Sequence, residues 1–148
     1  MLTDINILLY AVSPASPHHP AARDWLSQAL NGDLAVAFPW HSLLGFLRIS
    51  TSSRGSGSPI DATAAWAFVD EWLTAPAARV VGPGDRHATI LRGLMGRYQL
   101  RGDAVSDAHL AALAIEHDLT LVSFDRDFAR FREVRWLNPA SEAHSSLP

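Results

Sequence analysis

The feature that most constrains the fold is the alternation of short apolar runs with segments of helical periodicity along the chain. Apolar residues at helical spacing predict helices at residues 5–12, 18–30, 40–51, 61–73, 86–98 and 102–118. A further short helix is predicted at residues 128–131. Apolar runs between them predict short strands at residues 1–4, 34–38, 78–81, 119–124 and 134–138. Strands that alternate with helices form parallel sheets buried on both faces. We therefore expect an α/β fold, a three-layer α/β/α domain with a central parallel sheet.

Length and composition predict a single domain. A chain of 148 residues, 48% of them apolar, is large enough to bury one core. The stretch SSRGSGSP at 52–59 indicates a flexible surface loop, because neither flank would make a self-sufficient domain. We expect the domain to span residues 1–139 and residues 140–148 to form a disordered tail.

The charged residues exclude several functions. All twelve basic residues are arginine, and the chain contains neither lysine nor cysteine. A Walker-type phosphate loop, phosphoaspartate chemistry and Schiff-base catalysis need a lysine, and disulfides and thiolate metal sites need cysteine. A local arginine surface could still bind nucleic acid, although the net charge is −3.

The first residues do not resemble a secretory signal. They place an acid at position 4 and show neither a basic leader nor a cleavage site. No apolar run reaches the length that spans a bilayer. We therefore expect a cytoplasmic protein without a membrane partner.

Three aspartates fall at the predicted carboxyl ends of strands, where ligands gather in parallel sheets. Asp4 closes the first strand, Asp125 follows the strand at 119–124, and Asp107 opens the helix that leads into that same strand. Aspartate often caps a helix, so each also has an ordinary explanation, and either Asp125 or Asp127 could cap the short helix that follows. Asp4 is harder to explain this way, because a carboxylate between two apolar segments is costly unless a positive group pairs with it.

Three carboxylates at one edge would repel one another unless a cation lies between them. An all-oxygen ligand set favours Mg²⁺, with Mn²⁺ able to substitute, over zinc. Such ions typically keep water ligands, one of which can attack a phosphate. The pattern therefore predicts metal-assisted hydrolysis of a phosphodiester.

Five stretches of the chain form one ordered pattern: TDINILLYA, WHSLLGFLRIST, VSDAHLAALAIEHDL, LVSFDRDFARF and VRWLNP. This pattern resembles the PIN-domain family, and within it the VapC-like toxin ribonucleases of VapBC toxin–antitoxin systems. The resemblance covers nearly all of residues 1–139. It implies a PIN-like fold and a Mg²⁺-dependent endoribonuclease that leaves a 5′-phosphate and a 3′-hydroxyl.

The resemblance also assigns roles to individual residues. It implies that Asp4, Asp107 and Asp125 are the catalytic, metal-binding acids. It further implies that Asn6 supports the first acid and that Ser123 lies near the metal and the scissile phosphate.

One position departs from the family pattern. The family commonly has a glutamate on the helix after the second strand, where this chain has Gly45. The departure favours one metal ion over two, although Asp103 or Asp127 could compensate. Arg48 and Arg54, on and after that helix, are candidates for steering the RNA backbone, or are ordinary surface arginines.

The resemblance implies partners as well: an RNA substrate, a VapB-like antitoxin, and a homodimer that forms a heterotetramer or larger complex with that antitoxin. The antitoxin tail would lie in an apolar groove lined by some of the five tryptophans. We expect Trp25 and Trp40 to belong to the core instead. The pair His18 and His19 is expected to be a surface feature at a helix start, not a metal site.

Two other functions remain open. A catalytically silent PIN-like module that binds RNA or a protein is suggested by Gly45, where an acid is expected. A phosphatase with Asp4 as nucleophile is suggested by Asp-Ile-Asn after a strand, but the missing lysine and Asn6 in place of a second acid both oppose it.

Overall fold

The structure of this chain is a computed structural model that describes residues 1–53 and 59–142. Arg54, one of the two arginines expected to steer RNA, lies outside the described residues. So does the larger part of the expected tail, residues 143–148.

The centre of the fold is a five-stranded sheet in the order β3-β2-β1-β4-β5, and every pairing in it is parallel. Its strands are β1 (Leu2–Thr3), β2 (Val36–Pro39), β3 (Ala78–Val81), β4 (Leu121–Val122) and β5 (Trp136–Leu137). Several strands are shorter than the apolar runs that predict them. The parallel sheet expected from the sequence is confirmed.

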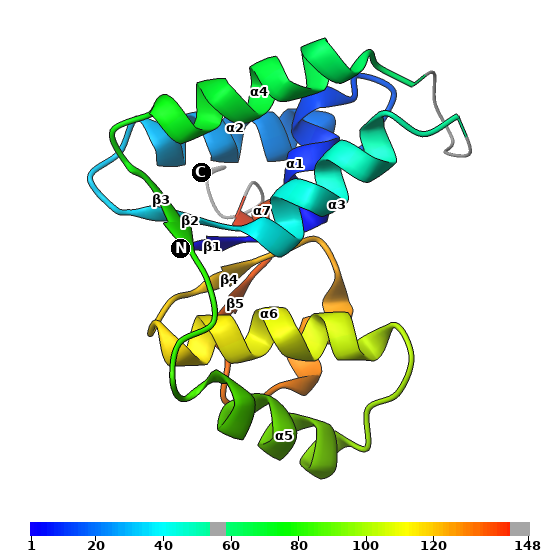
Figure 1. Cartoon of the computed structure of the whole chain (residues 1–148). Helices are drawn as coiled ribbons and strands as arrows, with labels where there is room; N and C mark the ends of the chain where they lie inside the picture. Colours follow the sequence, from blue (N-terminus) through cyan, green and yellow to red (C-terminus); the bar gives the residue numbers. More distant parts are fainter. Residues whose placement is uncertain (54–58, 143–148) are drawn as a thin grey trace.

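Helices cover the sheet on both faces, as Figure 1 shows. One face carries α1 (Ile5–Val12), α2 (His19–Leu30), α3 (Trp40–Ser50) and α4 (Ala62–Thr74). The other carries α5 (His87–Tyr98) and α6 (Ala104–Glu116), which pack against each other. A 3-10 helix, η1 (Arg126–Arg130), follows β4. The three-layer architecture is therefore confirmed.

Each face of the sheet has its own apolar cluster. Between the sheet and α1–α4, Phe38 and Phe46 pack on Trp72, with ring centroids 6.4 and 4.9 Å from it. Between the sheet and α5–α6, the buried side chains include Leu113 and Phe128. The buried apolar strands between these clusters explain why their sequences show continuous apolar runs instead of alternation.

The buried face of α3 differs from the expected one. Helical spacing puts four apolar residues on one stripe of this helix and predicts that they pack inward: Trp40, Leu43, Leu44 and Leu47. In the structure, however, Trp40 is 45% and Leu44 is 58% exposed. The buried positions are Ser42, Leu43, Gly45 and Phe46. The hydroxyl of Ser42 donates to the Thr3 carbonyl oxygen at 2.8 Å, which turns this face of α3 toward β1.

The expectation that Trp40 belongs to the core is therefore wrong, whereas Trp25 is partly buried against the first cluster. The last described helix, α7 (Pro139–Glu142), lies against α2, so the expected tail begins with helical residues. Within the described ranges no helix combines the length and hydropathy needed to cross a membrane.

Candidate active site

The candidate site begins where β1 and β4 end side by side. The pairing of these strands continues one residue beyond them, since the Asp4 amide donates to the Val122 carbonyl at 3.1 Å. Ser123 extends β4 in the same way, with its amide donating to the Leu137 carbonyl at 3.0 Å. The backbone therefore places Asp4 and Ser123 next to each other at the carboxyl edge of the sheet.

Asp4 is only 7% exposed and is held by three neutral donors. Its Oδ1 accepts from the Ile5 amide at 2.6 Å. Its Oδ2 accepts from Asn6 Nδ2 at 2.7 Å and from the Ser123 hydroxyl at 2.6 Å. No positive side chain is paired with Asp4 in the described parts of the chain. The carboxylate is therefore stabilised by hydrogen bonds from neutral donors and not by the positive group that its sequence position suggests.

Asn6 and Ser123 also contact each other, and they connect α1 to the turn after β4. Asn6 Nδ2 donates to Ser123 Oγ at 2.9 Å, and Asn6 Oδ1 accepts from the Phe124 amide at 3.2 Å. Ser123 Oγ accepts in addition from the Asp125 amide at 2.9 Å. The two side chains therefore fix both the carboxylate of Asp4 and the backbone of Asp125.

Burial raises the pKa of Asp4 to about 6. The hydrogen bonds from Ser123 and Ile5 lower this pKa, and the negative charges of Asp107 and Asp125 raise it further. Burial and then the charge of Asp125 also raise the pKa of Asp107. The charges of Asp107 and Asp125 therefore disfavour the negative form of Asp4, and the charge of Asp125 also disfavours that of Asp107.

Asp107 lies in the first turn of α6, while Asp103 is the N-cap residue and makes no side-chain capping hydrogen bond. Arg130 Nη2 lies 3.8 Å from Asp107 Oδ2 and forms a closer ion pair with Asp127. Asp125 caps η1, because its Oδ1 accepts from the Asp127 amide at 2.8 Å. Of the two acids in this turn, Asp125 is therefore the cap and Asp127 the partner of Arg130.

The side chains at this edge offer only part of a coordination shell to a divalent cation. Among residues 1–53 and 59–142, no three His, Asp or Glu side chains are spaced to enclose one metal ion. Mg²⁺ does not need such a cage, since it is usually held by one or two carboxylates and keeps several waters. The oxygen-only set and the raised pKa values of Asp4 and Asp107 fit such an ion.

Gly45 has a structural reason for lacking a side chain. A Cβ placed there would lie 2.5 Å from Ile5 Cδ1 and 2.8 Å from Ile5 Cγ1. Ile5 therefore fills the space that an acid on α3 would use. Arg48 lies on the last turn of the same helix and is exposed.

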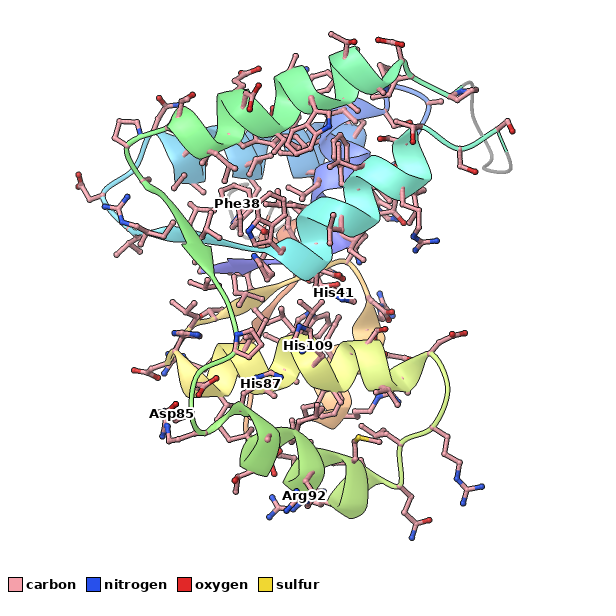
Figure 2. All side chains as sticks on the ribbon, viewed as in Figure 1. Phe38, His41, Asp85, His87, Arg92 and His109 are labelled. Atoms are coloured by element: carbon pink, nitrogen blue, oxygen red, sulfur yellow. The ribbon has the colours of Figure 1, made fainter. Side chains whose placement is uncertain are left out.

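Three histidines lie close together near this edge, although their spacing in the sequence does not indicate it. Figure 2 shows His41, His109 and His87 following one another from the start of α3 into the α5–α6 layer. His87 Nε2 lies 3.0 Å from His109 Nδ1, and the rings of His41 and His109 are 5.2 Å apart. Burial, followed by the charges of His41 and His87, lowers the pKa of His109 to about 4. His109 is therefore neutral near pH 7 and supplies no positive charge beside Asp107.

Fold and site together define an α/β protein with an acidic edge on a parallel sheet. The family model described as PIN domain matches residues 1–134. The chain belongs to the PIN-domain family, as the resemblance of its sequence implies.

Curated relatives and solved structures agree with this assignment. The chain is 44% identical over 138 residues to ribonuclease VapC37 of Mycobacterium tuberculosis, covering 93% of this chain and 96% of the relative. It is 38% identical over 142 residues to ribonuclease VapC33 of the same species, covering 96% and 99%. The fold resembles VapBC2 from Rickettsia felis, bound to a promoter DNA fragment, with a TM-score of 0.67, 18% identity and coverage of 93% and 96%. It also resembles the sarcin-ricin loop cleaving toxin VapC20 of Mycobacterium tuberculosis, with a TM-score of 0.66, 19% identity and coverage of 90% and 98%.

Proposed function

We propose that this chain is a metal-dependent endoribonuclease and the toxin component of a type II toxin–antitoxin system. The observation that carries the proposal is the buried carboxylate of Asp4 at the carboxyl edge of the sheet, joined through Ser123 to the backbone of Asp125 and disfavoured in its charged form by the charges of Asp107 and Asp125. Relatives at 38–44% identity, matched over almost their whole length, are named ribonucleases, which supports the same activity.

Asp4, Asp107 and Asp125 would hold Mg²⁺, one or two of them directly and the others through its water ligands, and Mn²⁺ would substitute. Bound there, the ion would activate a water molecule and stabilise the charge that grows on the phosphoryl oxygens. Asp103 is exposed and Asp127 is paired with Arg130, so both would add negative charge to the site without contacting the reacting atoms.

The remaining groups position these acids. Asn6 and Ser123 orient Asp4 through its Oδ2, and Ser123 also holds the amide of Asp125. Asp125 is exposed, and its carboxylate would orient the attacking water directly or through the ion. Arg48 extends from the end of α3 and attracts the RNA backbone.

The partners follow from the same comparisons. A VapB-like antitoxin, an RNA substrate and a homodimer that forms a heterotetramer or larger complex suit a chain whose structural relatives include toxin–antitoxin complexes. Exposed aromatic rings at Trp40 and Trp66 offer apolar contact area for the antitoxin. A cytoplasmic location is consistent with such a role.

The test is RNA cleavage by the purified full chain with Mg²⁺, with Mn²⁺ and with EDTA. The wild type and the control Asp33→Asn, a change at an exposed loop residue, should cleave RNA with either ion and lose activity in EDTA. Asp4→Asn should lose activity by at least about a hundredfold, since it removes a charged ligand. Equal cleavage by the wild type and Asp4→Asn would contradict the proposed mechanism.

A silent RNA-binding or protein-binding module is the second candidate, favoured by Gly45 in place of an acid. It predicts RNA binding without cleavage and no rise in melting temperature with Mn²⁺. A metal that binds the folded state must raise that temperature, so the two functions are separated by one thermal measurement.

A further inference from the structure

Three aromatic rings from separate segments meet beside the proposed catalytic edge. They belong to Tyr10 on α1, His18 at the start of α2, and Phe124 in the turn after β4. The ring centroids of Tyr10 and His18 are 5.1 Å apart, those of His18 and Phe124 are 4.7 Å apart, and those of Tyr10 and Phe124 are 5.4 Å apart. We call these three side chains the aromatic cluster.

Two of the three rings in the aromatic cluster border a cavity of about 640 Å³. Tyr10 and His18 line it, together with the prolines of the α1–α2 turn and residues at the end of α3. The volume falls within the range of pockets that hold small ligands. Because His18 is exposed, part of its ring remains accessible to a ligand in this cavity.

A short chain of hydrogen bonds connects the aromatic cluster to the catalytic carboxylate. The Phe124 amide donates to Asn6 Oδ1, and Asn6 Nδ2 donates to Asp4 Oδ2. Tyr10 lies four residues after Asn6 on α1, which corresponds to about 6 Å along the helix axis and to the same helix face. The cluster is therefore fixed within one helical turn of the group that holds Asp4.

We propose that the aromatic cluster and its cavity are a nucleobase-binding subsite for a nucleotide flanking the scissile phosphate. This inference rests on the proposed ribonuclease function. Single-stranded RNA is commonly recognised by splayed bases that stack on Phe, Tyr or His rings. The subsite would select substrates by the base it accepts, while the acids carry out hydrolysis.

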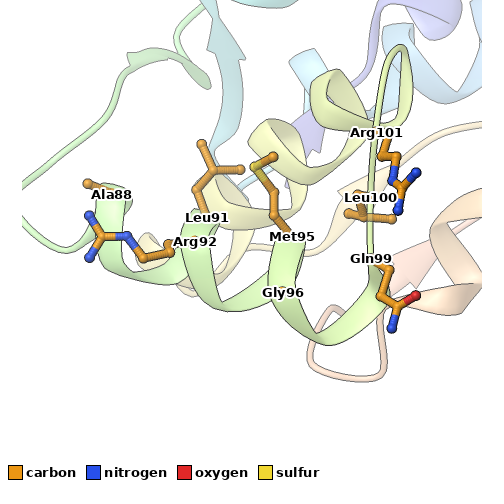
Figure 3. Close-up of a pocket in the computed structure, with 8 residues that line it drawn as sticks. All are labelled: Ala88, Leu91, Arg92, Met95, Gly96, Gln99, Leu100 and Arg101. Carbon is orange, nitrogen blue, oxygen red and sulfur yellow. The ribbon is translucent and has the colours of Figure 1, made fainter.

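A second surface groove does not offer the same chemistry. Figure 3 shows the groove along α5 and the residues that follow it, with Arg92 and Arg101 at its border. It is lined by aliphatic and polar side chains and has no aromatic ring. It could attract phosphates, but it provides no ring on which a base would stack.

The binding test uses single-stranded RNA oligonucleotides that carry 2-aminopurine at successive positions, with the full chain in EDTA so that RNA is not cleaved. Stacking should quench the fluorescence at one position. His18→Ala should weaken binding of that oligonucleotide by about fivefold or more, whereas His18→Trp should retain it because a ring is kept. His117→Ala, which makes the same change at an exposed histidine after α6 and outside this cavity, is the matched control and should bind like the wild type.

The kinetic test uses RNA with an abasic residue at the same positions, cleaved in Mn²⁺. For the wild type, KM should be higher for RNA that is abasic at one particular position than for intact RNA. For His18→Ala, the KM values of these two RNAs should be nearly equal. Absence of quenching at every position, or equal binding by the wild type and His18→Ala, would overturn the subsite. Loss of antitoxin binding by His18→Ala with RNA binding intact would also overturn it, because the cavity would then be a protein-docking groove.

Failure of the subsite and failure of the ribonuclease function give different results. RNA cleavage without any effect of base removal or of His18→Ala would refute only the subsite. Quenching at one position without any RNA cleavage in Mn²⁺ would support the subsite and refute the nuclease function.

Discussion

Replacing Asp4 by asparagine should remove a cost to the stability of the metal-free protein that grows with pH, even though it also removes a proposed catalytic acid. The carboxyl is almost fully buried and has its pKa raised from 3.8 to about 6. A shift of about 2 units corresponds to about 3 kcal/mol of unfavourable free energy for the charged form. Asparagine carries no charge, so this pH-dependent cost disappears in the variant. Its amide has only one acceptor oxygen for the three donors that Asp4 holds, and that loss is the same at every pH.

The sign and the pH range follow from proton binding. Below pH 3.8 Asp4 is largely protonated in both states, so its ionisation has little effect on stability. Between pH 3.8 and about 6 the folded state binds more protons than the unfolded state, so the free energy of unfolding falls as pH rises. Above about pH 6 the full cost is present. The free energy of unfolding of Asp4→Asn, taken relative to the wild type, should therefore rise by more than about 2 kcal/mol between pH 4 and pH 8.

Urea unfolding in EDTA at a series of pH values measures this difference. The measured quantity is the unfolding midpoint of Asp4→Asn minus that of the wild type. This difference should be about 1 M urea larger at pH 8 than at pH 4. Asp33→Asn is the control, because it makes the same chemical change at an exposed loop residue. A difference between Asp4→Asn and the wild type that stays constant with pH would refute the reasoning.

Three further predictions concern the same edge of the sheet. Gly45→Ala should lower the free energy of unfolding by about 1–2 kcal/mol because its Cβ meets Ile5, and urea unfolding should show a smaller cost in an Ile5→Val background. Ser123→Ala should destabilise the fold by about 1–3 kcal/mol. It should also move the acidic limb of the pH–rate profile to higher pH, because the hydroxyl lowers the pKa of Asp4 in the wild type and its removal raises that pKa. Mn²⁺ should raise the melting temperature of the wild type in thermal scans and leave that of Asp4→Asn nearly unchanged, and an equal rise in both would show that the ion binds elsewhere.

The layers of the fold could be predicted because the buried strands are continuous apolar runs between helical segments. The extent of each strand could not. The apolar run at 119–124 predicts six strand residues, whereas β4 contains only Leu121 and Val122. Strand length depends on where neighbouring strands stop pairing, and that depends on residues far away in the sequence.

The positions of the candidate acids follow from their places near strand ends, but their surroundings do not. Hydropathy treats Trp40 as a core residue, while the hydrogen bond from Ser42 to Thr3 turns α3 so that Trp40 faces outward. The histidines 41, 87 and 109 come together only through tertiary packing, and no spacing in the sequence indicates their contact.

Gly45 shows how a departure from a family pattern becomes interpretable only with a structure. From the sequence, a missing acid suggests a lost metal ligand and therefore a weaker or silent site. The structure gives a second cause, because Ile5 occupies the space beside Gly45 and follows directly after Asp4. The absence of an acid at position 45 and the presence of Ile5 after Asp4 therefore depend on each other, because the Ile5 side chain packs against Gly45. In chains that carry the glutamate at this position, the residue after the first aspartate should be small enough to leave room for it. The residues at positions 5 and 45 together, and not Gly45 alone, therefore set the number of carboxylates at the site.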